Sequence, residues 1–208
     1  MNSHAVVPLA ATIVFIPLLI ISLLHRPWQR QQGYLVLYII PAMLWSLSDF
    51  FLRSALLSID KVILVKIIVC MAFWMTVQFH YVLKSVHSKP GGIPLAVLPL
   101  IAIIALAAFN VMPKAVEITK EKTMVEYGIW ALLIAIVLLV IVGWDVYMLF
   151  RKRKAASQLS ERNQITYLII LTLIGMILVS SALTKIGTTY AISHVGNLII
   201  ALILLYAI

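Results

Sequence analysis

Charged residues and cysteine are both scarce in this sequence, and each shortage excludes a class of protein or of structure. Charged side chains make up 11% of the 208 residues and hydrophobic ones 63%, whereas soluble domains are about one-quarter charged and roughly half apolar. A water-soluble chain of this length could not bury so much apolar surface, so we predict a helical membrane protein. The single cysteine, Cys70, lies inside an apolar run. It therefore excludes an internal disulfide and leaves the redox compartment open.

The sequence also lacks the motifs of an enzyme. It has no paired-carboxylate site, no His and Cys residues at metal-ligand spacing, no glycine-rich phosphate loop and no convincing Ser, His and Asp set. We predict that the chain is not an enzyme and that it holds no cofactor and no metal. Its formal charge of +9 is explained by basic loops that face anionic lipid. Membrane lipid is therefore an expected partner and nucleic acid is not.

What the sequence does contain is a series of long apolar runs. A helix needs about 20 apolar residues to cross about 30 Å of hydrocarbon, and only a helix satisfies its own backbone groups in lipid. We place seven spans near Ala5–Leu24, Tyr34–Leu57, Val62–Leu83, Ile93–Met112, Ile129–Phe150, Gln164–Thr184 and Thr189–Ile208. The first run has no basic residue before it and no small-residue cleavage pattern after it, so we interpret it as a retained span. The predicted fold class is an all-α membrane protein, a seven-transmembrane helix bundle in which residues 1–208 form a single domain.

The basic residues of the loops predict the orientation, because Lys and Arg accumulate on the cytoplasmic side. With the N-terminus outside, nine of them fall in inner loops: Arg26, Arg30, Lys84, Lys89, Arg151, Lys152, Arg153, Lys154 and Arg162. Four fall in outer loops: Lys61, Lys114, Lys120 and Lys122. Arg53, Lys66 and Lys185 lie just inside the outer ends of spans and narrow the ratio to nine against seven. The balance favours an N-terminus outside and a cytoplasmic C-terminus.

Polar residues gather in the outer half of four predicted spans, although an ionisable group in hydrocarbon costs about 2.5–3.5 kcal/mol on insertion scales. Asp49 and Arg53 are one turn apart and can form an ion pair, while His194 and Asn197 share one face of the seventh span. We predict an outer ligand-binding pocket formed by these candidates: Trp45, Asp49, Arg53, Lys66, Ser181, Lys185, Tyr190, His194 and Asn197.

Most of these candidates also have a structural interpretation. The ion pair can simply hold helices together, Lys66 and Lys185 can reach the outer headgroups, and a serine near a helix end can bond the preceding turn. His194 and Asn197 are harder to explain in this way, because neither side chain can easily reach the headgroups from a turn or two inside the span. A role in a polar pocket or in a switch between helices is favoured for them.

A second polar layer lies near the cytoplasmic ends of the third and fifth spans, and it comprises Gln78, His80, Asp145 and Tyr147. Asp145 can pair with Lys84 or with the Arg151–Lys154 run, and His80 can reach the headgroups. We interpret this layer as structural. The alternative is that it couples helix movement to the cytoplasmic side.

The one substantial outer loop, Pro113–Tyr127, predicts a short hairpin. Val116 and Ile118 alternate with polar residues before Lys120, and Met124 and Val125 follow. Such a loop can cover the outer cavity, and a solvated connector is an equal alternative.

The chain resembles the seven-transmembrane N-terminal sensor region of prokaryotic histidine kinases, and the likeness extends over essentially the whole chain. It is carried by Leu44-Trp45-Ser46-Leu47, Glu126-Tyr127-Gly128-Ile129-Trp130, Arg162-Asn163-Gln164-Ile165-Thr166-Tyr167-Leu168, His194-Val195-Gly196-Asn197-Leu198-Ile199 and Tyr206-Ala207-Ile208. The resemblance implies an input domain in a prokaryotic plasma membrane, acting as a homodimer. It also implies a last span that continues into cytoplasmic signalling domains. No such domain follows Ile208, so we expect either the input part of a longer protein or a stand-alone relative that signals through a partner.

The first functional hypothesis is therefore a sensor for an unidentified small or lipid-like ligand, which relays its signal through the last helix to a cytoplasmic module, fused or in trans. A small-solute transporter is the alternative, although no repeated halves with broken helices are visible. A structural subunit of a membrane complex also remains open. A retinal photoreceptor is disfavoured, because the seventh span contains no lysine for a Schiff base.

Overall fold

The computed structural model describes residues 5–24, 30–54, 56, 60–87, 96–118, 123–126, 128–181 and 192–207. Within this part of the chain the helices are α1 (Val6–Leu24), α2 (Arg30–Ser54), α3 (Lys61–His87), α4 (Val97–Ala108), α5 (Gly128–Ala155), α6 (Leu159–Ser181) and α8 (Ile192–Ala207). Two strands, β1 (Ala115–Ile118) and β2 (Thr123–Glu126), lie between α4 and α5.

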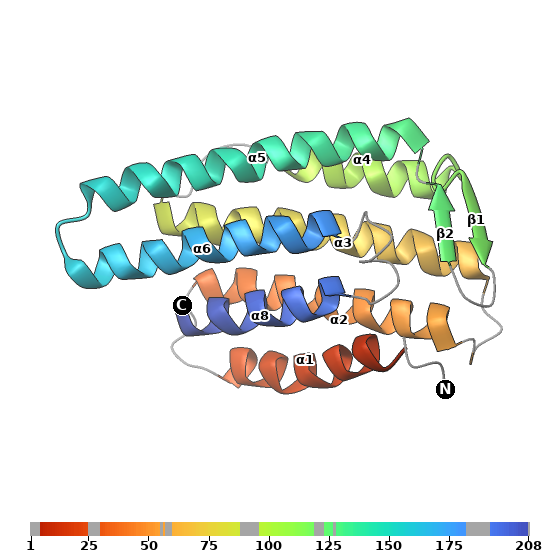
Figure 1. Ribbon diagram of the computed structural model, residues 1–208, viewed down its shortest axis with the longest axis horizontal. Coiled ribbons are helices and arrows are strands. Elements are labelled where there is room, and N and C mark those ends of the chain that lie inside the picture. The colour runs from red at the N-terminus through yellow and green to blue at the C-terminus, as the bar shows by residue number, and fades with distance from the viewer. Residues whose placement is uncertain are drawn as a thin grey trace.

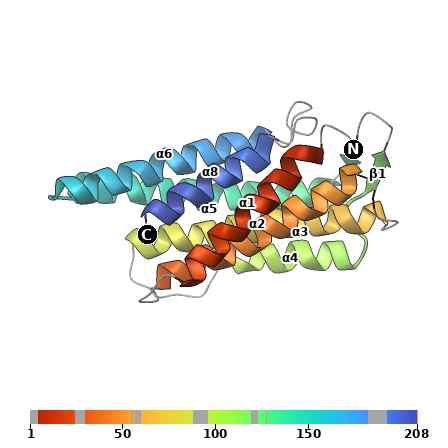
Figure 2. The same cartoon turned by 90° about the horizontal axis from the view of Figure 1, so that it is seen from below.

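The described helices form a bundle whose members run roughly along one axis (Figure 1). α4 and α5 lie on one side and α1 on the opposite side, with α2, α3, α6 and α8 between them. In Figure 2 α1 crosses in front of the bundle, where it packs against both α2 and α8. The hairpin lies at one end of the bundle, and the turn between α5 and α6 lies at the other and projects beyond the ends of α2 and α3 in both views.

The main core joins helices that are far apart in the sequence. Its buried residues include Phe15 of α1, Tyr38 of α2, Phe79 of α3, Leu168 of α6 and Leu204 of α8. Two smaller clusters pack α3 against α4 and α5. The core thus fixes α8, the last helix, between α1, α2 and α6.

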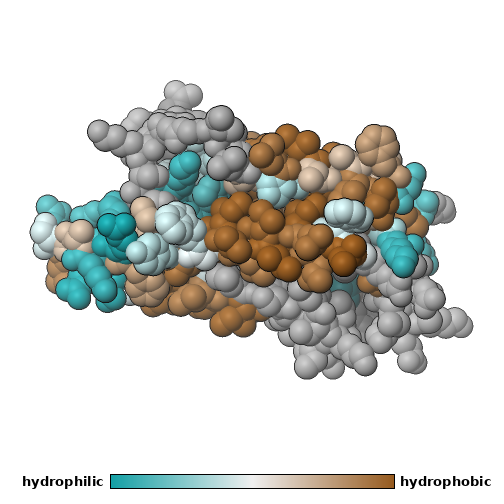
Figure 3. All heavy atoms as spheres, turned by 90° about the horizontal axis from the view of Figure 1, so that it is seen from above, coloured by the Kyte–Doolittle hydropathy of each residue, from teal (hydrophilic) through white to brown (hydrophobic). Residues whose placement is uncertain are grey.

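Among the residues that the structure describes, four helices are long and apolar enough to cross a membrane: α1, residues Gln32–Ser54 of α2, residues Lys61–Ser85 of α3, and α5. On α5 large apolar side chains face outward, with Leu132 57%, Val140 67% and Trp144 61% exposed. The face seen in Figure 3 carries an apolar band across its middle, and hydrophilic side chains gather at the end where α5 meets α6. These features are those of a membrane protein, because lipid solvates apolar side chains that water would not.

Several boundaries differ from the sequence-based spans. The fourth span was expected to reach Met112, but α4 ends at Ala108, because Asn110 adopts a positive φ of 58° that a helix cannot contain. The apolar parts of α4 and α8, Val97–Ala108 and Ser193–Leu205, are shorter than a full span among the described residues. The expected start of the seventh span at Thr189 lies outside the described residues.

The predicted hairpin in the long loop is confirmed. β1 and β2 pair antiparallel, with Ala115 opposite Glu126 and Ile118 opposite Thr123. The chain therefore leaves α4 and returns to α5 at the same end of the bundle (Figure 1). The fold class was predicted as all-α, and this small sheet is the exception to it.

Candidate functional site

A buried polar network joins α2 to α8 inside the bundle. Asp49 accepts hydrogen bonds on Oδ2 from Arg53 Nε at 2.8 Å, and the same oxygen lies 2.7 Å from His194 Nε2. The other ring nitrogen of His194, Nδ1, lies 2.9 Å from Ser46 Oγ. Because 145 residues separate Asp49 from His194, these bonds tie two distant parts of the chain together. We call Ser46, Asp49, Arg53 and His194 the α2–α8 network.

Helical spacing brings the α2 members onto one face. Ser46 and Asp49 are three residues apart and Arg53 follows four residues later, so successive side chains project from the same side of the helix. His194 is the third residue of α8, so the network lies at the N-terminal end of that helix. This end carries the positive pole of the helix dipole, which favours a carboxylate such as that of Asp49.

The network is well shielded from solvent. The side chains of His194 and Asp49 are 1% and 9% exposed, and that of Arg53 is 18% exposed. Trp45 covers the imidazole of His194, with the ring centres 4.6 Å apart and an interplanar angle of 34°. Arg53 is thus the member through which the network meets its surroundings.

The hydrogen bonds fit a neutral imidazole. If Nε2 carries the proton, it donates to the carboxylate of Asp49, while Nδ1 accepts from the hydroxyl of Ser46, and every group of the histidine is satisfied. The network then contains one carboxylate and one guanidinium, so its net charge is zero. A neutral, fully bonded arrangement is the one that a low-dielectric interior tolerates best. The network can therefore hold α2 and α8 together without an uncompensated charge.

A second polar contact between the same two helices lies next to this network. Tyr38 donates from its hydroxyl to Asn197 Oδ1 at 3.3 Å, and both residues are buried. Asn197 Nδ2 is buried without a hydrogen-bond partner in the part of the chain that the structure describes. An amide donor of this kind is available to a ligand or to a new contact when the helices move.

The structure brings together five of the nine predicted pocket residues. Trp45, Asp49, Arg53 and His194 meet directly, and Asn197 lies one turn along α8 from His194. Lys66 belongs elsewhere, because its Nζ donates to Asn110 Oδ1 and so connects α3 to the end of α4. Three predicted pocket positions lie outside the part of the chain that the structure describes: Lys185, Tyr190 and the side chain of Ser181.

Two residues of the site were not among the sequence-based candidates. Ser46 occupies the position three residues before Asp49, and its place on that face was the available signal. Tyr38 gave no signal of this kind, because an aromatic residue in an apolar run is normally a core residue. Its role depends on how α2 packs against α8, which the spacing within one helix does not reveal.

The inner polar layer also forms a buried pair. His80 Nδ1 of α3 lies 2.6 Å from Asp145 Oδ2 of α5, and their side chains are 14% and 1% exposed. The sequence allowed His80 to reach the headgroups, and the structure shows its Nδ1 bonded to Asp145. This pair joins α3 to α5 and involves no residue of α8.

Comparison with models of known protein families gave no match, and comparison with curated proteins gave no significant match either. Within the described ranges, no three His, Cys, Asp or Glu side chains are grouped as metal ligands would be. The contacts that the site does show are hydrogen bonds and charge interactions between α2 and α8.

Proposed function

We propose that this chain is a membrane-embedded signal-input domain, in which the α2–α8 network sets the position of the last helix. In the full proposal the chain crosses a prokaryotic plasma membrane seven times, with its N-terminus outside and its C-terminus in the cytoplasm. It acts as a homodimer and passes its signal to a histidine-kinase-type module, fused or in trans. The resemblance in sequence and the arrangement of buried polar groups support this proposal.

The observation that carries the proposal is the link from Asp49 to His194. It is made at the first turn of α8, and α8 runs from there toward the end of the bundle opposite the hairpin (Figure 1). A change in the link is therefore transmitted along a continuous helix to the far end.

The ligand in this proposal is a small or lipid-like molecule that reaches the network through Arg53. It competes for the Asp49 carboxylate or supplies an acceptor for the free amide donor of Asn197. A ligand shifts an equilibrium only by binding its two states with different affinity, and a full switch requires about 5.5 kcal/mol of difference. Breaking and replacing several buried hydrogen bonds is a physical source of such a difference.

The proposal is tested by fusing the chain, through α8, to the kinase module of a well-behaved histidine kinase. We expect His194→Ala to change the basal kinase output by about fivefold or more, the lower end of typical coupling between sites. His80→Ala is the matched control, because it removes a buried histidine from a pair that does not include α8. Output is measured as phosphate incorporation at equal protein levels in membranes.

Equal output from wild type, His194→Ala and His80→Ala would reject the proposed coupling through α8. Equal changes in both variants would point to general loosening of the bundle and would reject it as well.

A transporter is the second candidate, and the presence of two buried His–Asp pairs favours a proton-linked one. Asp49 with His194 and Asp145 with His80 connect different helix pairs of the same bundle. Solute-driven proton uptake into vesicles that contain only this chain would support transport, and its loss in both His194→Ala and His80→Ala would assign it to these pairs.

A further inference from the structure

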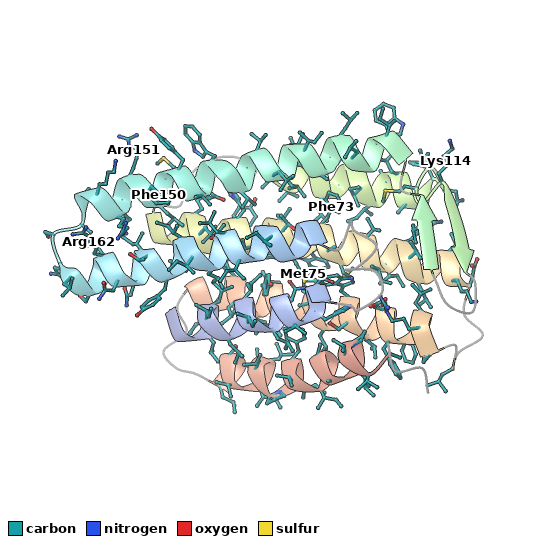
Figure 4. All side chains as sticks on the ribbon, in the orientation of Figure 1. Phe73, Met75, Lys114, Phe150, Arg151 and Arg162 are labelled. Carbon is teal, nitrogen blue, oxygen red and sulfur yellow. The ribbon has the colours of Figure 1, made fainter. Side chains whose placement is uncertain are left out.

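The end of the molecule where α5 meets α6 carries a dense group of basic side chains. Near its C-terminus α5 contributes Arg151, Lys152, Arg153 and Lys154, the last three of them in its final turn, and the first turn of α6 contributes Arg162. In Figure 4 Arg151 and Arg162 lie at this end, whereas Lys114 lies at the hairpin end. Neighbouring positive charges in this number repel one another, so an anionic partner would stabilise them.

Only part of this charge is neutralised by the chain itself. Lys152 Nζ lies 3.3 Å from Glu161 Oε1, and this ion pair joins α5 to α6. The remaining four residues, Arg151, Arg153, Lys154 and Arg162, have no carboxylate partner among the described residues, and we call them the basic tip. Three of them are exposed. Arg153 is half-buried, and its Nε has no hydrogen-bond partner in the described part of the chain.

The basic tip begins where the apolar surface ends. Phe150 is an exposed apolar residue of α5, and at about 1.5 Å per residue Lys154 stands about 6 Å further along the helix axis. The headgroup layer on each side of a bilayer is about 5–8 Å thick. With Phe150 in the hydrocarbon, the three basic-tip residues of α5, Arg151, Arg153 and Lys154, therefore fall within the headgroup layer.

Two aromatic residues of α5 lie just inside this boundary. Trp144 and Tyr147 are 61% and 52% exposed, and their rings contact each other with centres 5.5 Å apart. Tryptophan and tyrosine concentrate at the level of the headgroups, where one part of the ring is in lipid and the polar part is in water. Tyr147 and Trp144 precede Phe150 by about 4.5 Å and about 9 Å along the helix axis, so the pair lies on the membrane side of the basic tip.

We propose that the basic tip is a binding surface for the phosphate groups of anionic phospholipids. Three guanidinium groups provide forked donors that match phosphate oxygens in pairs, and Lys154 adds a point charge. This inference does not depend on the proposed signalling function, because it requires only that the chain lies in a bilayer.

The test is the lipid selectivity of the purified chain in phosphatidylcholine bilayers. Electron paramagnetic resonance with spin-labelled phosphatidylglycerol or spin-labelled phosphatidylcholine measures how much of each lipid the protein holds. We expect a preference for phosphatidylglycerol, and we expect the double variant Arg151→Gln with Arg162→Gln to reduce it by roughly a factor of two or more. Added sodium chloride should weaken the preference in the wild type, since the attraction is electrostatic.

Two control variants distinguish an effect of the basic tip from a general effect of the protein's charge. Lys152→Gln combined with Glu161→Gln removes the neutral ion pair at constant net charge, and Lys114→Gln removes a cation at the hairpin end. Both are expected to keep the selectivity of the wild type. If Arg151→Gln with Arg162→Gln keeps it too, or if both controls lose it equally, the proposal is overturned. If inorganic phosphate abolishes the preference and chloride of equal ionic strength does not, the tip is a site for free phosphate, and the assignment to lipid is wrong.

Discussion

At the scale of single residues, the chemistry of the site depends on how completely its buried groups are satisfied. His194 has a partner on each ring nitrogen, and Asp49 receives two donors on one oxygen. The removal of one partner leaves another buried group without its hydrogen bond, which costs more than the bond itself contributes. The network is therefore most sensitive to change at its buried members, His194 and Asp49.

We predict that His194→Ala destabilises the protein by about 1–3 kcal/mol, because Ser46 loses its partner and Asp49 keeps only Arg53. Arg53→Gln should lower the free energy of unfolding by less, about 0–1 kcal/mol. The Arg53 side chain is 18% exposed, so water or lipid headgroups can partly replace its hydrogen bond to Asp49. Reversible unfolding in detergent measures both changes. A larger loss for Arg53→Gln than for His194→Ala would contradict the assigned roles.

The sequence predicted most members of this site and one of its contacts, the ion pair of Asp49 with Arg53, which is confirmed; it did not predict how α8 joins them. Asp49, Arg53 and His194 were identified because ionisable groups in apolar runs are costly and so require a reason. Lys66 was identified by the same rule and lies elsewhere, since depth along a helix does not say which neighbour a side chain faces. Tyr38 was missed because its contact with Asn197 exists only after α2 and α8 have packed.

At the scale of helices, close contacts decide how far α8 can move. Gly175 of α6 is buried against α8, and a Cβ built there would lie 2.9 Å from Cδ1 of Ile200. The absence of a side chain thus allows α6 and α8 to approach each other. Helix interfaces in membranes commonly use small residues in this way.

We predict that Gly175→Leu destabilises the protein by about 1–3 kcal/mol, because a large side chain there must displace Ile200 and push α8 outward. Gly175→Ala should have a small effect, since the methyl group of Ile200 can move and alanine favours the helix. Gly143 of α5 is the control, because nothing lies within 4 Å of a Cβ built there. Thermal unfolding should therefore distinguish Gly175→Leu from Gly143→Leu, and equal shifts would contradict the close packing of α6 and α8.

The predicted helices agree with the structure where apolar runs are long and uniform. α1 matches the span expected from Ala5 closely, and α5 begins one residue before Ile129 but continues five residues beyond the expected end at Phe150. α2 and α3 extend beyond the expected spans at their polar ends, because a helix continues after its apolar part has left the hydrocarbon. α4 is shorter than expected, because a run of apolar letters does not reveal the turn at Asn110.

At the scale of the whole molecule, the polar ends of the bundle differ in character. One end carries the β1–β2 hairpin, and the other carries the basic tip (Figures 1 and 4). This asymmetry is the structural counterpart of the charge bias in the loops, which places basic residues in the cytoplasm. It supports the proposed orientation with the hairpin outside.

We predict that, in a Cys70→Ala background, a cysteine at Lys114 is labelled by a membrane-impermeant maleimide added to intact cells. A cysteine at Gln158 should be labelled only after the cells are opened. Both positions are exposed in the structure, so a difference in labelling reports the side of the membrane. Labelling of Gln158→Cys in intact cells would contradict the proposed orientation and would place this end of the bundle outside.

We propose that the α2–α8 network holds α8 in one of two positions. The distance between α2 and α8 is the quantity that tests this proposal. Spin labels at Leu37 of α2 and Leu202 of α8, which are 41% and 48% exposed, report the separation of these helices by double electron–electron resonance in lipid bilayers. We expect His194→Ala to show a second population at a different distance, and His80→Ala to show the wild-type distance distribution. A wild-type distribution in His194→Ala would contradict it.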